Sequence, residues 1–291
     1  MSDQPIVYLD GAFLPLQQAR VSVLDRGFLF GDGVYEVIPV YAGRAFLLDE
    51  HLARLERSLD AIRLKNPLGR AAWSTMISTL IARQGPGDWS VYLQVTRGCD
   101  DHRDHAFPAE IRPTVFAMAS PLKPPPAAWL TDGIATLSRP DPRWNRCDIK
   151  AIALLPNALS RQEAKDAGAV EIIYLRDGVL TEGAASNIFV VRDGVLLTSR
   201  ADERILHGIT RHLVLQLAGA AEITVCETDI PEEAVRSADE LWMTSSTRAV
   251  IPITRLDGAP VGTGRPGPMH RRMMALWDAA LARWRQGAAL L

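Results

Sequence analysis

Alternating apolar and polar positions predict a series of short strands in the first part of the chain. Residues 6–14 (I-V-Y-L-D-G-A-F-L) form two such segments around Asp10 and Gly11, and Asp-Gly between apolar runs is the strongest short signal for a β-hairpin. The same alternation predicts strands in the segment 34–40, in W-S-V-Y-L-Q-V-T and in P-T-V-F-A-M-A-S. The N-terminal part is therefore expected to be rich in strands.

Apolar residues at helical spacing predict helices between and after these strands. In the segment 48–64 they recur three or four positions apart, and acidic residues stand in the first turn, where they interact favourably with the helix dipole. A second helix is expected at 70–84. Further along, N-A-L-S-R-Q-E-A-K-D-A-G predicts a helix over 157–167 with Pro156 in its first turn. The segment 269–285 predicts the last helix.

Three consecutive prolines in P-L-K-P-P-P-A-A-W suggest where the chain divides. Such a run is stiff and extended, and it is typical of a connection between domains. A chain of 291 residues is long enough for two hydrophobic cores. We therefore expect an N-terminal domain at 1–120, a linker at 121–133 and a C-terminal domain at 134–291.

Composition and charge exclude several classes of protein. The chain is 47% hydrophobic and 23% charged with a net charge of -2, and its arginines are dispersed, so no basic patch indicates nucleic acid or an anionic membrane. The three cysteines lack C-x-x-C spacing, which predicts neither a disulfide framework nor a metal site. No signal-peptide pattern or membrane-length apolar run is present. A cytoplasmic protein without a metal, nucleic-acid or membrane partner is expected.

One lysine is set inside an apolar run. Lys150 stands in the sequence C-D-I-K-A-I-A-L-L, and it is one of only four lysines against twenty-eight arginines. An ammonium group in apolar surroundings loses solvation, which favours the neutral, nucleophilic amine that can form a Schiff base. Taken alone, the pattern also fits a lysine at the solvent edge of a strand.

A carboxylate follows thirty-two residues later. Glu182 stands in T-E-G-A-A-S-N, directly after a strand-turn-strand pattern made by E-I-I-Y-L, R-D-G and V-L-T. A glutamate at a turn is usually solvated. In enzymes that use pyridoxal phosphate, however, a carboxylate beside the ring nitrogen keeps that nitrogen protonated.

Together, Lys150 and Glu182 in these contexts resemble the fold-type-IV pyridoxal phosphate enzymes. The segment D-R-G-F-L-F-G-D-G-V-Y-E-V is similar to the signature of that family, and the resemblance extends from about Tyr8 to Val261. The family includes branched-chain aminotransferases, D-amino acid aminotransferases and aminodeoxychorismate lyases, and the chain looks most similar to the D-amino acid aminotransferases. The resemblance implies a mixed α+β and α/β fold in two domains: a smaller N-terminal α/β domain and a larger, β-barrel-like C-terminal domain with helices. It also implies a homodimer, because family members build each pocket with help from the neighbouring subunit.

The resemblance also implies a set of cofactor-binding residues. Lys150 would hold pyridoxal phosphate as an internal aldimine, and Glu182 would face its ring nitrogen. In E-H-L-A-R-L, Arg54 would bind the phosphate, with His51 in a supporting role, although both would otherwise read as solvated residues beside an apolar stripe. The motif L-H-G-I-T-R opens a helix, whose N-terminal amides can bind an anion. This motif and the later T-S-S-T-R assign further phosphate contacts to Ile209, Thr210, Ser245 and Ser246.

Substrate contacts follow from two other segments. Tyr35, after G-D-G-V, would line the substrate pocket, and R-D-H-A-F-P would place Arg103 and His105 beside it to hold the α-carboxylate. Read by its charges alone, C-D-D-H-R-D-H is a self-neutralising surface loop. Its spacer before Arg103 is one residue longer than the family pattern, which would allow His102 to compete for the role. Arg97 at the strand end is expected to be structural.

These assignments predict a ping-pong transaminase that moves the amino group between a D-amino acid, such as D-alanine or D-glutamate, and a 2-oxo acid. Ala184 and Ala185 replace serines that are frequent after T-E-G, which would alter the rate or substrate range. A branched-chain L-amino acid aminotransferase and an aminodeoxychorismate lyase remain as alternatives. A non-catalytic binding protein on this fold is a more remote one, because such a protein has no need for Lys150, Glu182 and Arg54 together.

Overall fold

The chain forms two compact units in a computed structural model that describes residues 5–290. The first unit contains residues 5–123 together with Ile149–Ala153, and the second contains Pro124–Asp148 and residues 154–290. Of the helices in this described part, none is both long and apolar enough to cross a membrane.

The expected domain limits differ from these units in two respects. The division after Lys123 lies inside the expected linker 121–133, but that stretch is not wholly extended, because helix α4 (Ala127–Thr131) begins directly after Pro126. In addition, Ile149–Ala153 groups with the first unit, although the sequence suggested one continuous domain over 134–291. The reason is a set of backbone hydrogen bonds to the first unit's sheet, described below.

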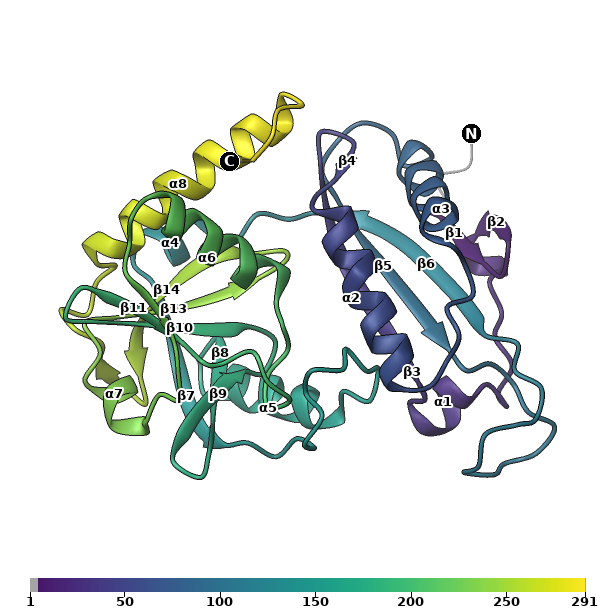
Figure 1. Ribbon diagram of the computed structural model, residues 1–291, viewed down its shortest axis with the longest axis horizontal. Coiled ribbons are helices and arrows are strands. Elements are labelled where there is room, and N and C mark those ends of the chain that lie inside the picture. Colours follow the sequence, from purple (N-terminus) through teal and green to yellow (C-terminus); the bar gives the residue numbers. More distant parts are fainter. Residues whose placement is uncertain (1–4, 291) are drawn as a thin grey trace. The chain divides into compact units, whose positions relative to one another are not determined.

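The first unit is an antiparallel sheet with two helices packed on it (Figure 1). The strand order is β2-β1-β6-β5-β3-β4. Its strands are β1 (Ile6–Leu9), β2 (Ala12–Pro15), β3 (Gly33–Tyr41), β4 (Arg44–Ala45), β5 (Trp89–Thr96) and β6 (Thr114–Pro121). Its helices are the 3-10 turn η1 (Leu16–Gln18), α1 (Arg26–Phe30), α2 (Leu48–Ala61) and α3 (Arg70–Ala82). The predicted hairpin is confirmed, with Asp10 and Gly11 both at positive φ in its turn.

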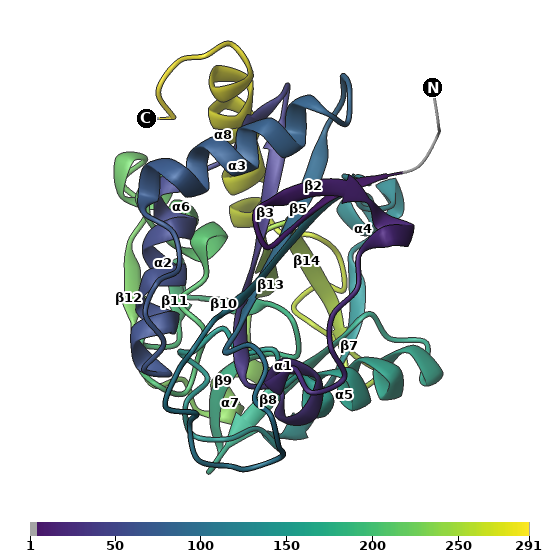
Figure 2. The same cartoon turned by 90° about the vertical axis from the view of Figure 1, so that its right-hand side faces the viewer.

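Helices α2 and α3 share one hydrophobic core with the sheet (Figure 2). Leu52, Leu55 and Leu59 of α2 are buried against inward-facing strand residues such as Ile38 and Leu93. The apolar stripe predicted for 48–64 is therefore the face that packs. On the opposite face of β3, Tyr35 and Val37 are only partly buried.

The segment Ile149–Ala153 adds to the free edge of β3. Tyr35 N donates to the carbonyl of Lys150 at 2.9 Å, and Ile152 N donates to that of Gly33 at 3.1 Å. A Cβ on Gly33 would lie 2.6 Å from the Val95 carbonyl oxygen, which is closer than real atoms approach. Gly31 has φ +67°, and a Cβ there would lie 3.2 Å from that of Ala153. Gly33 is therefore needed for the close approach of β5, whereas Gly31 leaves room for Ala153.

The second unit contains a nine-stranded mixed sheet. Its strand order is β12-β11-β10-β13-β14-β7-β8-β9, with β15 paired to β14. The strands are β7 (Ile134–Pro140), β8 (Glu171–Arg176), β9 (Val179–Gly183), β10 (Asn187–Arg192), β11 (Val195–Thr198), β12 (Val225–Glu227), β13 (Glu240–Ser245), β14 (Ala249–Leu256) and β15 (Ala259–Pro260). Although β9 ends the strand order, it lies against β10. The sheet is therefore curled, which agrees with the β-barrel-like shape expected.

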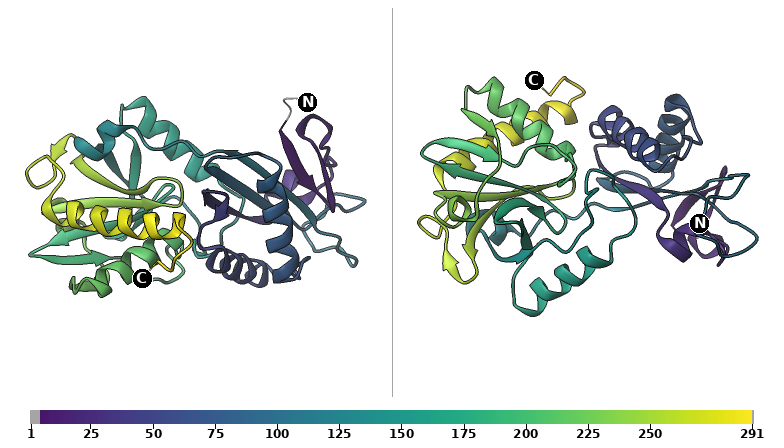
Figure 3. Two further views of the ribbon diagram at one scale, coloured as in Figure 1. Left: turned by 90° about the horizontal axis from the view of Figure 1, so that it is seen from above. Right: turned by 60° about the horizontal axis from the view of Figure 1, so that its bottom comes forward.

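Helices cover this curled sheet at several places (Figure 3). They are α4, α5 (Leu155–Asp166), α6 (Ile209–Ala220), α7 (Glu232–Arg236) and α8 (Pro268–Arg285). Helix α5 packs on β8, while α6 and α8 pack on each other and on β13. Pro156 lies in the first turn of α5, as predicted, and Gly168 follows the end of this helix at φ +70°.

The tight edge of β3 generates a stability prediction. Gly33→Ala should lower the free energy of unfolding by about 1–3 kcal/mol, the usual cost of forcing an atom into a packed site. Gly219→Ala is the matched control, because Gly219 lies inside α6 with open space around it. A helical glycine replaced by alanine should gain up to about 1 kcal/mol. Chemical denaturation of both variants checks this, and an unchanged Gly33→Ala variant would contradict the close packing.

Candidate active site

Lys150 and Tyr35 meet at the edge of β3. The Lys150 ammonium nitrogen lies 4.1 Å from the centroid of the Tyr35 ring, and the backbone N–H of Lys150 donates to Ser58 Oγ of α2 at 3.3 Å. The lysine is only partly buried. The first unit thus brings together the predicted Schiff-base lysine and the predicted pocket tyrosine, with the amine against an aromatic face.

Arg54 and His51 are held in a buried cluster by Glu36. Arg54 Nε and Nη2 donate to the two oxygens of Glu36 at 2.7 Å each, and His51 Nδ1 lies 2.7 Å from the same carboxylate. All three side chains are almost completely buried. The expectation of two solvated flank residues on α2 is therefore wrong, and Arg54 is instead a rigidly oriented cation.

The electrostatics of this cluster follow from burial and pairing. Burial alone would raise the pKa of Glu36, but the charges and hydrogen bonds of Arg54 and His51 hold it well below its usual range. Burial lowers the pKa of His51, and the nearby charges of Arg54 and Lys150 lower it further against the effect of Glu36. Sequence reasoning missed Glu36. Strand alternation could have found it, because Val34, Glu36 and Ile38 point the same way into the core.

The structure does not bring Arg103 and His105 to Tyr35 within one chain. Both are exposed, and both lie against the ring of Phe30: the Arg103 guanidinium carbon is 4.9 Å from its centroid, and the His105 ring centroid 5.1 Å. Over residues 5–290 neither forms a hydrogen bond, ion pair or ring contact with Tyr35. Within one chain, contacts of these two residues with Tyr35 are absent from the described part, and their substrate role stays a prediction.

Glu182 is the centre of a buried cluster in the second unit. It is 4% exposed on β9, where Arg143 Nη1 donates to one oxygen while Asn187 Nδ2 and the N–H of Leu206 donate to the other at 2.9 and 3.0 Å. Burial raises the pKa of Glu182 to about 7, against the lowering effect of Arg143 and Leu206. A carboxylate so poorly solvated would gain much from a neighbouring cation.

Arg143 was missed by sequence reasoning. Its guanidinium is nearly buried and also forms a two-pronged ion pair with Asp141, with nitrogen–oxygen distances of 2.9 and 2.8 Å. Asp141 in turn accepts from Arg176 at 3.0 Å. The charges R-P-D-P-R just before the lysine segment are the only sequence signal for this network. Arg143 orients Glu182, and Asp141 orients Arg143.

Uncapped donors gather near the start of α6. Gly208 is the N-cap, and no side chain caps the first amides of this twelve-residue helix, which include those of Ile209 and Thr210. Helix α6 packs on β13. At the start of α6, Gly208 lies against Asn187, which pairs with Thr244 of β13. The buried hydroxyls of Thr244 and Ser245 have no hydrogen-bond partner among the described residues. Ser246 follows, partly buried. Free hydroxyls and helix N-terminal amides form a donor set suited to an oxyanion such as phosphate.

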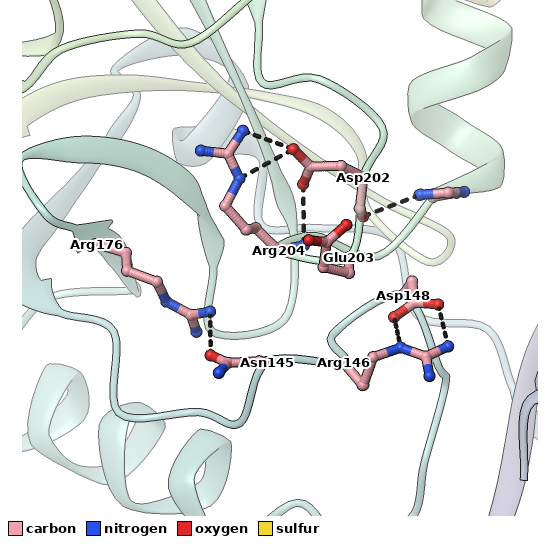
Figure 4. A pocket seen from close by; sticks show the side chains of 8 residues that line it. Asn145, Arg146, Asp148, Arg176, Asp202, Glu203 and Arg204 are labelled. Atoms are coloured by element: carbon pink, nitrogen blue, oxygen red, sulfur yellow. Dashed lines mark hydrogen bonds and ion pairs between the residues drawn. The ribbon is translucent and has the colours of Figure 1, made fainter.

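A charged cavity of about 710 Å³ opens elsewhere in the second unit (Figure 4). Its charged side chains largely pair with each other: Arg146 faces Asp148 at 2.9 Å, and Arg204 pairs with Asp202. None of the predicted site residues lines it, but Arg176, which pairs with Asp141 in the network around Glu182, does.

Comparison with known proteins identifies the class to which this fold and these clusters belong. The family model described as Amino-transferase class IV matches residues 33–256, so the chain belongs to the class IV aminotransferases. It is 38% identical over 277 residues to a D-alanine aminotransferase of Bacillus licheniformis, covering 95% of this chain and 97% of that protein. It is 37% identical to one of Listeria innocua, over 92% and 93%.

Solved structures agree on the fold. A branched-chain amino acid aminotransferase of Escherichia coli is similar with a TM-score of 0.86 and 26% identity, covering 95% of this chain and 94% of that one. A branched-chain aminotransferase of the thermophilic archaeon Thermoproteus uzoniensis, solved with norvaline, gives a TM-score of 0.85 and 27% identity, over 95% and 94%.

The buried state of Glu182 predicts a pH-dependent stability of the cofactor-free protein. Because its folded pKa of about 7 exceeds the ordinary 4.5, the folded state binds the proton more tightly than the unfolded one. This stabilisation is complete below about pH 4.5, falls by roughly 1 kcal/mol per pH unit as the pH rises to 7, and is then constant. Glu182→Gln lacks it.

Denaturation of both proteins at pH 5, 6, 7 and 8 measures the effect. The ion pair with Arg143 exists only while Glu182 is ionised, so its effect is already part of the net pKa of Glu182, and the slope of the difference reports that titration. Between pH 5 and 7, the free energy of unfolding of Glu182→Gln should rise relative to that of the wild type. Parallel profiles would contradict the raised pKa.

Proposed function

We propose that this aminotransferase moves the amino group between a D-amino acid and a 2-oxo acid, with pyridoxal phosphate held by Lys150. The observation that carries the proposal is the similarity of nearly the whole chain to two D-alanine aminotransferases. The donor sets described above fit the cofactor: a partly buried amine, a desolvated carboxylate and orphaned hydroxyls beside a helix N-terminus.

Lys150 is assigned both a binding and a proton-transfer role. Its amine would join the cofactor aldehyde, and once a substrate amine takes its place, the freed Nζ would move the proton from the substrate α-carbon. When bound, pyridoxal phosphate supplies an electron sink for the charge left on that carbon. The backbone hydrogen bond from Tyr35 on β3 to the Lys150 carbonyl keeps the amine on one rigid edge.

Glu182 would hold the proton on the cofactor's ring nitrogen. Arg143 and Asn187 fix its carboxylate from one side, so its orientation is set before any ligand arrives. Burial makes the carboxylate a strong partner for a cationic ring, because a charge removed from water gains more from its counterion. We assign the phosphate to the amides of Ile209 and Thr210 and the hydroxyls of Ser245 and Ser246. Arg54 would add its charge, with Glu36 setting the direction of its guanidinium.

We further propose that the enzyme is a homodimer in which Tyr35 of one protomer and the Arg103–His105 loop of the other hold the substrate α-carboxylate. Two observations support this arrangement. The loop side chains are exposed and rest on Phe30 of their own chain. Both are cationic or hydrogen-bonding groups suited to a carboxylate.

The first experiment records the visible absorption spectrum before and after adding D-alanine without an acceptor. The band of lysine-bound cofactor should be present and should convert to that of the aminated cofactor. A band that D-alanine leaves unchanged, but L-leucine converts, would replace the proposal with a branched-chain L-aminotransferase. Pyruvate released from aminodeoxychorismate without an amino acceptor would indicate a lyase, and the absence of any band would indicate a binding protein.

Replacing the lysine tests the mechanism. Lys150→Ala should lower kcat with D-alanine and a 2-oxo acid by at least about 100-fold, as expected when a proton-transfer group is lost, and should abolish the band of lysine-bound cofactor. Lys165→Ala, at the exposed end of α5, is the matched control and should retain both. Near-normal turnover in Lys150→Ala would refute the assignment.

A further inference from the structure

Arg26 grips the loop that carries Arg103 and His105. It is the first residue of α1 and is only 3% exposed. Its Nη1 donates to the carbonyls of Asp104 at 2.6 Å and Ala106 at 3.1 Å, and its Nη2 donates to that of His105 at 3.1 Å. One guanidinium therefore satisfies three consecutive carbonyls of an otherwise exposed segment, and its hydrogen bonds are charge-assisted.

Asp32 forms an ion pair with the Arg26 guanidinium. Arg26 Nε donates to Asp32 at 2.8 Å, and Arg97 pairs with the same carboxylate at 2.8 and 3.0 Å. Although burial opposes ionisation, these two arginines hold the pKa of Asp32 below its usual value. Arg97 also lies 3.6 Å from the centroid of the Phe107 ring. The loop is thus held by its carbonyls and by the aromatic side chain that follows them.

Phe30 provides the surface on which the loop side chains rest. It follows Arg26 by one helical turn, so both lie on the same face of α1, and the Arg26 guanidinium carbon is 4.9 Å from its ring centroid. Arg103 and His105 contact the same ring. Helix α1 is itself fixed by its N-cap Asp25, which accepts hydrogen bonds from the Gly27 N–H and from Thr96.

The extra loop residue lies outside this grip. The spacer 99–102 precedes Arg103, and His102 is 73% exposed, with its nearest acidic partner Asp100 at 4.0 Å. The three held carbonyls begin only at Asp104. The longer spacer therefore leaves the Arg103–Ala106 backbone anchored.

We propose that Arg26 is a positioning residue for substrate recognition, which holds the backbone of residues 104–106 so that Arg103 and His105 project together from Phe30. The inference rests on the proposed function, which assigns the substrate carboxylate to those two side chains. Arg26 touches neither substrate nor cofactor in this account. Its loss should therefore weaken substrate binding while leaving the cofactor in place.

The test measures steady-state kinetics and visible spectra of the cofactor-bound enzyme. Arg26→Met should raise KM for D-alanine about tenfold or more, since small misplacements of positioning groups cost up to about 100-fold, with kcat within about threefold and an unchanged cofactor band. Arg26→Lys keeps the charge but not the fork of donors, so its KM should fall between. Arg83→Met, which removes another arginine stacked on an aromatic ring (Phe13, 4.6 Å), should match the wild type.

Arg103→Met separates the positioning role of Arg26 from the assignment of the substrate carboxylate to the loop. If it raises KM and Arg26→Met does not, the positioning role is overturned alone. If neither variant changes KM, the carboxylate assignment falls as well. Loss of kcat and of the cofactor band in Arg26→Met at unchanged KM would show a general structural role and also overturn the proposal.

A second variant gives a readout that does not depend on Arg26→Met. Arg26→Lys keeps the proposal testable if Arg26→Met fails to fold, because it retains the charge beside Asp32 but loses the fork of donors to the loop carbonyls. A KM for D-alanine equal to that of the wild type in Arg26→Lys would overturn the proposal.

Discussion

The pairing of Ile149–Ala153 with β3 is the constraint on which the rest of the site depends. It takes five residues that the chain connects at both ends to the second unit and fixes them on the first unit's sheet. Lys150 is thereby held on a strand edge against the Tyr35 ring. Gly31 and Gly33 lack side chains where Ala153 and the Ile152 side chain approach. The glycine-rich signature therefore serves to seat a lysine.

Buried carboxylates organise the charged cluster of each unit in the same way. Glu36 orients Arg54 in the first unit, and Arg143 orients Glu182 in the second. Each pair is rigid, because an unpaired charge in such surroundings would be several kcal/mol less stable. The two carboxylates differ in whether their partners outweigh the effect of burial. At Glu36 the two partners do, and its pKa is lowered; at Glu182 burial has the larger effect, and its pKa is raised. A further cation would therefore stabilise ionised Glu182 more than it would stabilise Glu36.

Local signals predicted most of the secondary structure. The Asp10-Gly11 hairpin, the stripe of α2 and the proline start of α5 all depend on neighbours a few residues apart, and the structure has each of them. The proline run before α4 misled, because its last proline ends an extended stretch and starts a helix turn. The longer loop at 99–102 looked disruptive in sequence, but it precedes the carbonyls that Arg26 holds.

The sequence alone determined which chemical groups the protein has and in what local setting: a lysine in an apolar run, a glutamate after a strand, and a glycine that opens a helix. Only the tertiary structure decided their partners. Glu36 meets Arg54 across 18 positions, Arg143 meets Glu182 across 39, and Arg26 meets Asp104 across 78. Such contacts leave no periodicity or spacing in the chain, because they arise where separate elements pack, and packing is set by the whole core rather than by neighbours in sequence.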